Sequence, residues 1–263
     1  APADIEITAP DATATYGDAS AVYSGSYTIT AGQTYFGDTL SGLVCDNTYV
    51  QGDGVGTADY TYCTDSTDTN YNFTFVNGVV TINPATQNVT INPTTGSGNY
   101  GGTYNTPTPN NVDGTPSYTS NDPSICTVDP VTGVITATGV GTCVITITIT
   151  GSTNYTDPAP LTYTLEIAPA DIEITAPDAT ATYGDPSANF SGDPYLSNGS
   201  WQFGDNITSL VSLVCNVDYN STTPVGTYSG AVTCSDAGDP NYNISFVPGN
   251  LVVTQATQNV TIN

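Results

Sequence analysis

Six cysteines are the residues of this chain whose type and spacing point most directly to a chemistry. They form three local pairs along the sequence: Cys45 with Cys63, Cys126 with Cys143, and Cys215 with Cys234. An even number of cysteines in close pairs, without histidine or a four-cysteine cluster, favours disulfides over a zinc site. Each bond would close a short loop and contribute about 3 kcal/mol to stability. The alternative is reduced cysteines that serve as small buried hydrophobic residues.

The ionisable residues restrict the remaining chemistry, because the chain has 24 acidic residues and no lysine, arginine or histidine. No conventional base is present to activate a serine or cysteine nucleophile, and no arginine is present to hold a phosphate. Only carboxylate chemistry remains, and we expect these acids to be solvated on turns and polar strand faces rather than tuned for glycoside hydrolysis. We therefore predict no enzymatic activity. A net charge of −24 also excludes nucleic acid as a partner.

Oxygen-bearing side chains gather in two corresponding loops that follow Cys63 and Cys234. The candidate ligands are Asp65, Asp68 and Asn70 in the first loop and Asp236, Asp239 and Asn241 in the second. Calcium prefers such oxygen ligands, so calcium is the one cofactor that the sequence suggests. The alternative is that these residues form Asx turns on solvated loops.

Acceptor sites for N-glycosylation, of the pattern Asn-x-Ser/Thr, recur along the chain. They are Asn72, Asn88, Asn154, Asn189, Asn198, Asn206, Asn220, Asn243 and Asn259. A chain this rich in Asn, Ser and Thr would contain several by chance, so their frequency alone is weak evidence. The strand pattern turns Asn72, Asn88, Asn243 and Asn259 outward, which makes a glycan sterically possible at these positions.

The single tryptophan, Trp201, lies in a loop-like stretch near Tyr195. Exposed aromatic rings often form platforms for sugars, so these two residues are candidates for a ligand site. The alternative, which we favour, is that Trp201 packs against the core or its edge.

Two exact repeats define the organisation of the chain. Residues 1–18 return at 168–185, and residues 85–92 return at 256–263. The repeats predict three segments, which we call the first, middle and third segments, followed by the first strand of another repeat. Their predicted bounds are 1–85, 86–170, 171–256 and 257–263.

Within each segment the pattern predicts β-strands only. In the first strand Ile5 and Ile7 alternate with acids and should share a buried face. Cys45 should lie opposite Cys63 in one hairpin, and the chain should form another hairpin at Asn77 and Gly78. Cys143 and the isoleucines that alternate after it should face inward. We therefore predict tandem antiparallel β-sandwich domains, immunoglobulin-like in the broad sense, in a stiff rod-like array.

These motifs carry a resemblance to known families. The first and third segments resemble the MBG-type repeat of bacterial surface proteins. Its motifs stand here as Tyr16–Asp18, Gly37–Asp38, Tyr183–Asp185, Gly204–Asp205, Val225–Tyr228 and Asn241–Gly249. The first segment departs from the pattern at Val55–Tyr60, which reads VGTADY. The middle segment resembles the group 2 bacterial immunoglobulin-like domain, through Ser120–Ser124, Thr127–Asp129, Thr132–Ala137 and Gly139–Thr142. Both resemblances imply surface display and adhesion rather than a particular ligand.

The sequence thus predicts a non-catalytic structural repeat of an extracellular protein, secreted or at the cell surface, that builds a stalk, filament or matrix. Its expected partners are neighbouring repeats of the same chain and further copies within fibres; we expect no membrane insertion in this stretch. One alternative is an adhesin that binds a glycan or protein receptor. Another is a filament subunit in which Asp4–Thr8 or Thr257–Asn263 completes the sheet of a neighbour.

Overall fold

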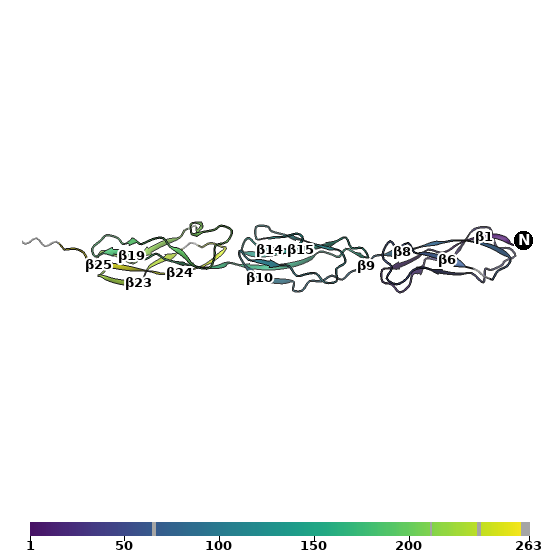
Figure 1. Cartoon of the computed structure of the whole chain (residues 1–263), viewed down its shortest axis with the longest axis horizontal. Helices are drawn as coiled ribbons and strands as arrows, with labels where there is room; N and C mark the ends of the chain where they lie inside the picture. The colour runs from purple at the N-terminus through teal and green to yellow at the C-terminus, as the bar shows by residue number, and fades with distance from the viewer. Residues whose placement is uncertain (65–66, 211, 236–237, 259–263) are drawn as a thin grey trace, which may run out of the picture. The chain divides into compact units, whose positions relative to one another are not determined.

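The computed structural model describes residues 1–64, 67–210, 212–235 and 238–258. β-Strands joined by turns and loops run along all of these ranges, and the one helical element among them is a three-residue 3₁₀ turn, Ile207–Ser209 (Figure 1). The chain divides into two compact units, both of which contain part of the middle segment. Unit 1 comprises Ala1–Asn92, Thr108–Ser117 and Ile147–Leu161, and unit 2 comprises Pro93–Pro107, Tyr118–Thr146 and Thr162–Asn263. The predicted all-β fold of tandem β-sandwiches is confirmed, whereas the predicted segment boundaries remain predictions.

In unit 1, the first segment forms two sheets with strand orders β4-β1-β7 and β3-β2-β8-β6-β5. The strands are β1 (Ala3–Thr8), β2 (Ala12–Thr15), β3 (Val22–Tyr23), β4 (Thr28–Ala31), β5 (Val44–Asn47), β6 (Tyr60–Thr64), β7 (Tyr71–Val76) and β8 (Gly78–Asn83). As predicted, Ile5 and Ile7 share a buried face of β1, where they pack with Tyr71. A second core cluster joins β2 to β8 through Ala12, Val80 and their neighbours. Side-chain alternation therefore supplies the buried face of each sheet.

In unit 2, the third segment repeats this plan with the orders β21-β18-β24 and β20-β19-β25-β23-β22. The strands are β18 (Ala170–Thr175), β19 (Ala179–Thr182), β20 (Asn189–Phe190), β21 (Tyr195–Asn198), β22 (Val214–Val217), β23 (Gly226–Ser235), β24 (Tyr242–Val247) and β25 (Gly249–Thr254). Ile174, Val232 and Leu251 are fully buried. The repeated sequence thus encodes a repeated fold.

The middle segment forms two sheets, β10-β17-β15-β12 and β11-β14-β13, and a short pair, β16-β9. The strands are β9 (Ala85–Thr86), β10 (Thr95–Asn99), β11 (Thr103–Asn105), β12 (Thr115–Ser120), β13 (Cys126–Val128), β14 (Val134–Ala137), β15 (Gly141–Thr150), β16 (Tyr155–Thr156) and β17 (Leu161–Ala168). The predicted inward face of β15 is confirmed, because Cys143 and the three isoleucines that follow it are all buried.

All three predicted disulfides are formed. Cys45 lies directly opposite Cys63 in the antiparallel pair β5–β6, as predicted, and Cys215 lies opposite Cys234 in β22–β23. The third bond joins Cys126 of β13 to Cys143 of β15. Each disulfide therefore staples strands within one predicted segment.

The confirmed sandwich fold contains parallel strand pairs that the sequence did not reveal. Strand β1 pairs parallel with β7, and β2 pairs parallel with β8. Because β7 and β8 belong to different sheets, the predicted hairpin at Asn77 and Gly78 is wrong. At this point the chain instead crosses from the sheet that contains β7 to the sheet that contains β8. The connection between β1 and β2 crosses between the same two sheets beside it.

The crossings explain why glycine begins both β8 and β25. A Cβ atom at Gly78 would lie 2.7 Å from the carbonyl oxygen of Ala9, and one at Gly249 would overlap the carbonyl oxygen of Pro177. An aspartate near each crossing binds the residue that follows the glycine. The Asp11 side chain accepts a hydrogen bond from the Val79 N–H at 2.8 Å, and the Asp178 side chain accepts one from the Asn250 N–H at 2.7 Å. These glycines serve close backbone approach rather than a turn.

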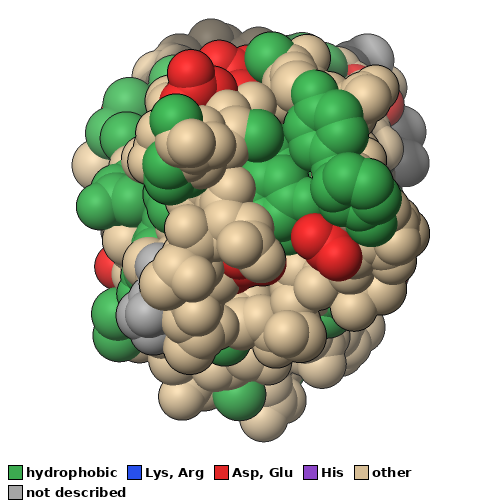
Figure 2. All heavy atoms as spheres, turned by 90° about the vertical axis from the view of Figure 1, so that its right-hand side faces the viewer, with side chains coloured by type: hydrophobic (Ala, Val, Ile, Leu, Met, Phe, Trp, Pro, Cys, Tyr) green, Lys and Arg blue, Asp and Glu red, His purple; other side chains and the backbone are tan. Residues whose placement is uncertain are grey.

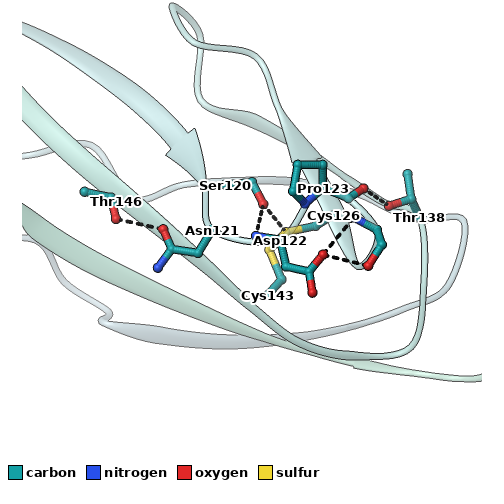
Figure 3. The surroundings of a disulfide bond; sticks show 9 residues. Ser120, Asn121, Asp122, Pro123, Cys126, Thr138, Cys143 and Thr146 are labelled. Carbon is teal, nitrogen blue, oxygen red and sulfur yellow. Dashed lines mark hydrogen bonds between the residues drawn. A yellow bond between two sulfur atoms is a disulfide. The ribbon is translucent and has the colours of Figure 1, made fainter.

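In the middle segment, residues 120–123 lie beside the disulfide between Cys126 and Cys143 (Figure 3). The Ser120 hydroxyl lies 3.2 Å from the sulfur of Cys126, and Thr146 donates a hydrogen bond to the side chain of Asn121 at 3.1 Å. The hydroxyl and the N–H of Ser124 both donate to Asp122 Oδ1, at 2.6 and 3.0 Å. These bonds hold the pKa of Asp122 below its usual value.

Because the pKa of Asp122 is lowered in the folded chain, the contribution of its carboxylate to the free energy of unfolding depends on pH. The unfolded chain binds the proton of Asp122 more readily than the folded chain, so the contribution is present above about pH 4 and is lost as the pH falls below it. We expect Asp122→Asn to be less stable than the wild type at pH 6, and the difference to shrink by pH 2. Denaturant titrations of both proteins at several pH values measure it. A difference that is constant with pH would contradict this role.

Candidate functional site

Those predicted calcium ligands that the structure describes lie in ordinary turns. Asp65 and Asp236 lie outside the described residues. Asp68 Oδ1 accepts a hydrogen bond from the N–H of Asn70 at 2.9 Å, and Asp239 Oδ1 accepts one from Asn241 at 2.8 Å. This is the Asx-turn geometry of the alternative interpretation. Within the described ranges no group of three or more acidic or cysteine side chains is arranged to hold a metal, and calcium remains a prediction.

The predicted glycosylation sites are mostly exposed, although Asn259 lies outside the described part of the chain. The exposed ones are Asn72, Asn88, Asn189, Asn198, Asn206, Asn220 and Asn243. Asn154 is half-buried, and its Oδ1 accepts a hydrogen bond from the N–H of Val55 at 2.9 Å. The amide nitrogens of Asn72 and Asn243 donate to Asp4 and Asp171, respectively, so a glycan would replace a bond between strands there. Glycosylation itself remains a prediction.

Of the two candidate sugar-binding residues, Trp201 is packed and Tyr195 is not. The Trp201 ring meets Tyr242 edge-on, with ring centroids 5.3 Å apart, and is half-buried. Tyr195 lies in β21 and is exposed. The packing of Trp201 agrees with the alternative that we favoured, while a ligand role for either residue remains a prediction.

The most developed cluster of chemical groups in unit 2 was not predicted from the sequence. It centres on Tyr100, in the turn between β10 and β11, whose ring meets those of Phe203 and Tyr242 edge-on with centroid distances of 5.4 Å each. Tyr100 is 7% exposed and Tyr242 is 5% exposed. A residue of the middle segment is therefore buried against the third segment, and we call this contact the tyrosine junction.

One carboxylate holds both phenols of the tyrosine junction. Asp205 Oδ2 accepts a hydrogen bond from the Tyr242 hydroxyl at 2.8 Å and one from the Tyr100 hydroxyl at 3.3 Å. The Tyr242 hydroxyl also accepts a bond from the N–H of Gln202 at 2.9 Å. Burial, reinforced by the charge of Asp205, raises the pKa of both phenols, which therefore stay protonated as donors.

The local sequence explains how this site is shaped. Phe203 and Gly204 both have positive φ, at 51° and 91°, and the Asp205 N–H closes the turn on the carbonyl of Gln202 at 2.9 Å. This Phe-Gly-Asp turn presents a ring and a carboxylate on the same side. In the middle segment, the residue that faces this turn is Gly101. A Cβ atom there would overlap the Gln202 side chain, so the residue after Tyr100 must be small.

Hydrogen bonds to backbone carbonyls anchor the turn that carries Tyr100. The Tyr100 N–H donates to the carbonyl of Ala168 at 2.9 Å, and the side-chain amide of Asn99 donates to the carbonyl of Pro169 at 3.2 Å. Across the junction, Asn241 Oδ1 accepts a bond from the N–H of Val140 at 3.3 Å. The N–H of Ala170, just after the peptide that links β17 to β18, donates to the carbonyl of Asn241 at 2.9 Å, so this connection is bonded to both segments.

Unit 1 contains a different contact, between the first segment and residues of the middle segment. The rings of Tyr16 and Tyr155 meet edge-on with centroids 5.4 Å apart, and the N–H of Val55 donates a hydrogen bond to Asn154 Oδ1 at 2.9 Å. Within the middle segment itself, β9 pairs parallel with β16, and the buried Gln87 side chain donates hydrogen bonds to the carbonyl of Asp113 at 3.1 Å and to the Ser152 hydroxyl at 2.8 Å. Both links along the chain thus combine an aromatic pair with polar anchors.

A signal for the tyrosine junction is present in the sequence. The Phe-Gly-Asp turn and the later Asn-Tyr pair occur in the first and third segments alike, and the middle segment places Tyr100 before two glycines. A conspicuous aromatic beside a turn, repeated in two segments, suggests a common docking role. Identifying the docked residue requires the three-dimensional fold.

Comparisons with known proteins support part of the resemblance. Residues 172–252 match the family described as MBG domain (YGX type). No curated protein sequence matches the chain. Within its described residues, no helix has the length and apolar character needed to cross a membrane.

The solved structures that match the chain include an S-layer protein and two cadherins. Domains 4 and 5 of the S-layer protein SbsC are 16% identical, with 59% of this chain and 91% of that chain covered and a TM-score of 0.27. Mouse cadherin-23 EC22-24 is 9% identical, with 97% and 100% covered and a TM-score of 0.33. Drosophila N-cadherin EC1-3 is 9% identical, with 94% and 98% covered and a TM-score of 0.30. Likenesses at this level establish neither a family nor a function.

Proposed function

We propose that this chain is a non-catalytic structural stretch of an extracellular surface or fibre protein, in which aromatic junctions fix each segment to the next. The tyrosine junction carries the proposal. A solvent-exposed connection would suffice for segments that move independently, but here a buried ring, a shared carboxylate and backbone anchors join two segments. Such a contact costs conformational freedom and is useful where spacing and orientation must be kept.

Composition and covalent chemistry support the same proposal. The MBG match covers the third segment, the three disulfides suit an oxidising compartment, and the absence of Lys, Arg and His removes the usual catalytic bases. We infer that the acidic surface keeps such an array soluble and prevents unspecific association with like-charged surfaces.

Chain continuation accounts for the array better than strand exchange between subunits. Strand β1, which contains the candidate donor Asp4–Thr8, already lies between β4 and β7 in its own sheet. Part of the other candidate, Thr257–Asn263, lies outside the described residues. An adhesive role for a single segment remains the second proposal, because exposed aromatic residues such as Tyr195 are available to a partner.

Immunogold electron microscopy on intact cells of the source tests the proposal, with antibodies raised against this chain. We expect gold outside the cell boundary, along stalks or fibres. Label that appears only after the cells are permeabilised would contradict an extracellular role. Label confined to the tips of appendages would favour the adhesin over the structural array.

A further inference from the structure

The first segment has a surface hollow at the position that corresponds to the tyrosine junction of the third segment. It has a volume of about 400 Å³ and is lined by Ala1, Ala3, Tyr35, Phe36, Asp38, Asn70 and Tyr71. Figure 2 views the end of the molecule that carries the N-terminus, where hydrophobic side chains gather in a continuous cluster beside a carboxylate. This end therefore presents an apolar surface with a hydrogen-bond acceptor at its edge.

The hollow has the same internal geometry as the site that binds Tyr100. Phe36 and Gly37 have positive φ, at 56° and 81°, and the Asp38 N–H closes the turn on the carbonyl of Tyr35 at 3.0 Å. The Tyr71 hydroxyl donates to Asp38 Oδ2 at 3.0 Å and accepts from the Tyr35 N–H at 2.9 Å. Asp205, Gln202 and Tyr242 make the same pair of bonds in the third segment.

The two sites differ in what covers them. Phe203, beside Tyr100, is 58% exposed, whereas Phe36 at the equivalent position is 102% exposed. A fully exposed phenylalanine held at positive φ is an expensive arrangement, both sterically and for the hydration of the ring. The turn at Phe36 has the same backbone conformation as the turn at Phe203, whose ring contacts Tyr100. The Phe36 ring is therefore oriented to contact a partner in the same way.

The peptide that enters the first segment also matches the junction. Residues 1–3 repeat residues 168–170, and at the tyrosine junction the carbonyls of Ala168 and Pro169 accept hydrogen bonds from the Tyr100 N–H and the Asn99 side-chain amide. Asn70 corresponds to Asn241, whose side chain accepts the bond from Val140. The first segment therefore carries, apart from Tyr35 in place of Gln202, the groups that anchor a Tyr-Gly-Gly turn.

We propose that this hollow is a docking site for the Tyr-Gly-Gly turn of another segment of the middle type, with the incoming tyrosine packed between Phe36 and Tyr71 and its hydroxyl donated to Asp38. The proposal deepens the structural function proposed above, because it names the partner that continues the array at this end. Asp38 favours a phenol over a plain ring, and the glycine after the tyrosine leaves room for Tyr35.

The test adds a copy of residues 86–167 directly before Ala1 of the full chain. NMR relaxation by a soluble gadolinium chelate then measures how well water reaches the Phe36 ring. We expect the relaxation enhancement at Phe36 to fall to about that of Phe203 in the same molecule. With Tyr100→Ala in the added copy only, the enhancement should return to its value in the 263-residue chain. Tyr100→Phe in that copy should weaken docking by less than about tenfold, because one hydrogen bond is lost.

An added copy that is folded, as its own dispersed signals would show, but leaves Phe36 as accessible as before would overturn the proposal. If the added copy does not fold, a synthetic peptide of residues 95–105, which contains the Tyr-Gly-Gly turn, replaces it at millimolar concentration. Protection of Phe36 by this peptide but not by its Tyr100→Ala version is expected, and an equal effect of both would contradict the proposal. The extracellular role is judged separately by the immunogold result, so either idea can fail alone.

Discussion

Tyr100→Ala is expected to release the third segment from the middle segment and to lower the free energy of unfolding of unit 2 by about 3 kcal/mol. The substitution removes a 7% exposed ring, two edge-to-face ring contacts and one hydrogen bond to Asp205. The single tryptophan reports on this change directly, because Trp201 packs against Tyr242 within the junction. Urea unfolding followed by tryptophan fluorescence measures the loss.

Tyr100→Phe is the matched control for this prediction. It keeps the ring and removes only the hydroxyl that lies 3.3 Å from Asp205, so a loss of about 1 kcal/mol is expected. The first segment has no part in the junction and should unfold as in the wild type. Equal stability of the Ala variant and the wild type would show that the ring contributes no docking energy.

Gly249→Ala is expected to destabilise the third segment by about 3 kcal/mol or more, which is a large part of the stability of a small domain. The new methyl group would overlap the carbonyl of Pro177 where the chain crosses between sheets. That oxygen belongs to the backbone and cannot rotate away, so β19 or β25 must shift. Thermal unfolding followed by circular dichroism, with Trp201 fluorescence as a second probe, measures the effect.

The control is Gly226→Ala, in strand β23 of the same segment. A Cβ there would lie 3.7 Å from the Tyr228 ring, an ordinary contact, so this change should be neutral or slightly stabilising. Gly78→Ala tests the equivalent crossing in the first segment, where the oxygens of Ala9 and Pro10 would lie 2.7 and 2.9 Å from the new atom. If Gly249→Ala were as harmless as Gly226→Ala, the close crossing would not exist in solution.

Features governed by local alternation could be predicted from the sequence. The buried face of Ile5 and Ile7, the register of Cys45 with Cys63 and the inward face of β15 all follow from a period of two and the positions of turns. The core must lie on one face of each strand, so these patterns survive whatever the strand order is. The disulfide pairs followed in the same way from their proximity along the chain.

Pairing between distant strands could not be predicted in this way. Asn77-Gly78 has the composition of a tight hairpin turn, but the parallel partners β1 and β2 run beside β7 and β8 and carry the chain across the sandwich. The neighbouring sequence does not distinguish a glycine needed for a tight turn from one such as Gly78, which leaves room for the backbone of Ala9 and Pro10. The tyrosine junction was missed for the same reason, since Tyr100 and Asp205 are brought together only by the fold.

The central claim is that, within unit 2, the tyrosine junction holds the third segment and the part of the middle segment that belongs to this unit together as one body. Residual dipolar couplings of the wild-type chain, measured for the strands of residues 126–137 and 170–254, test it most directly. A single alignment tensor that fits both sets of couplings is predicted, and Tyr100→Ala should separate it into two. Two tensors of different magnitude in the wild type would contradict the claim.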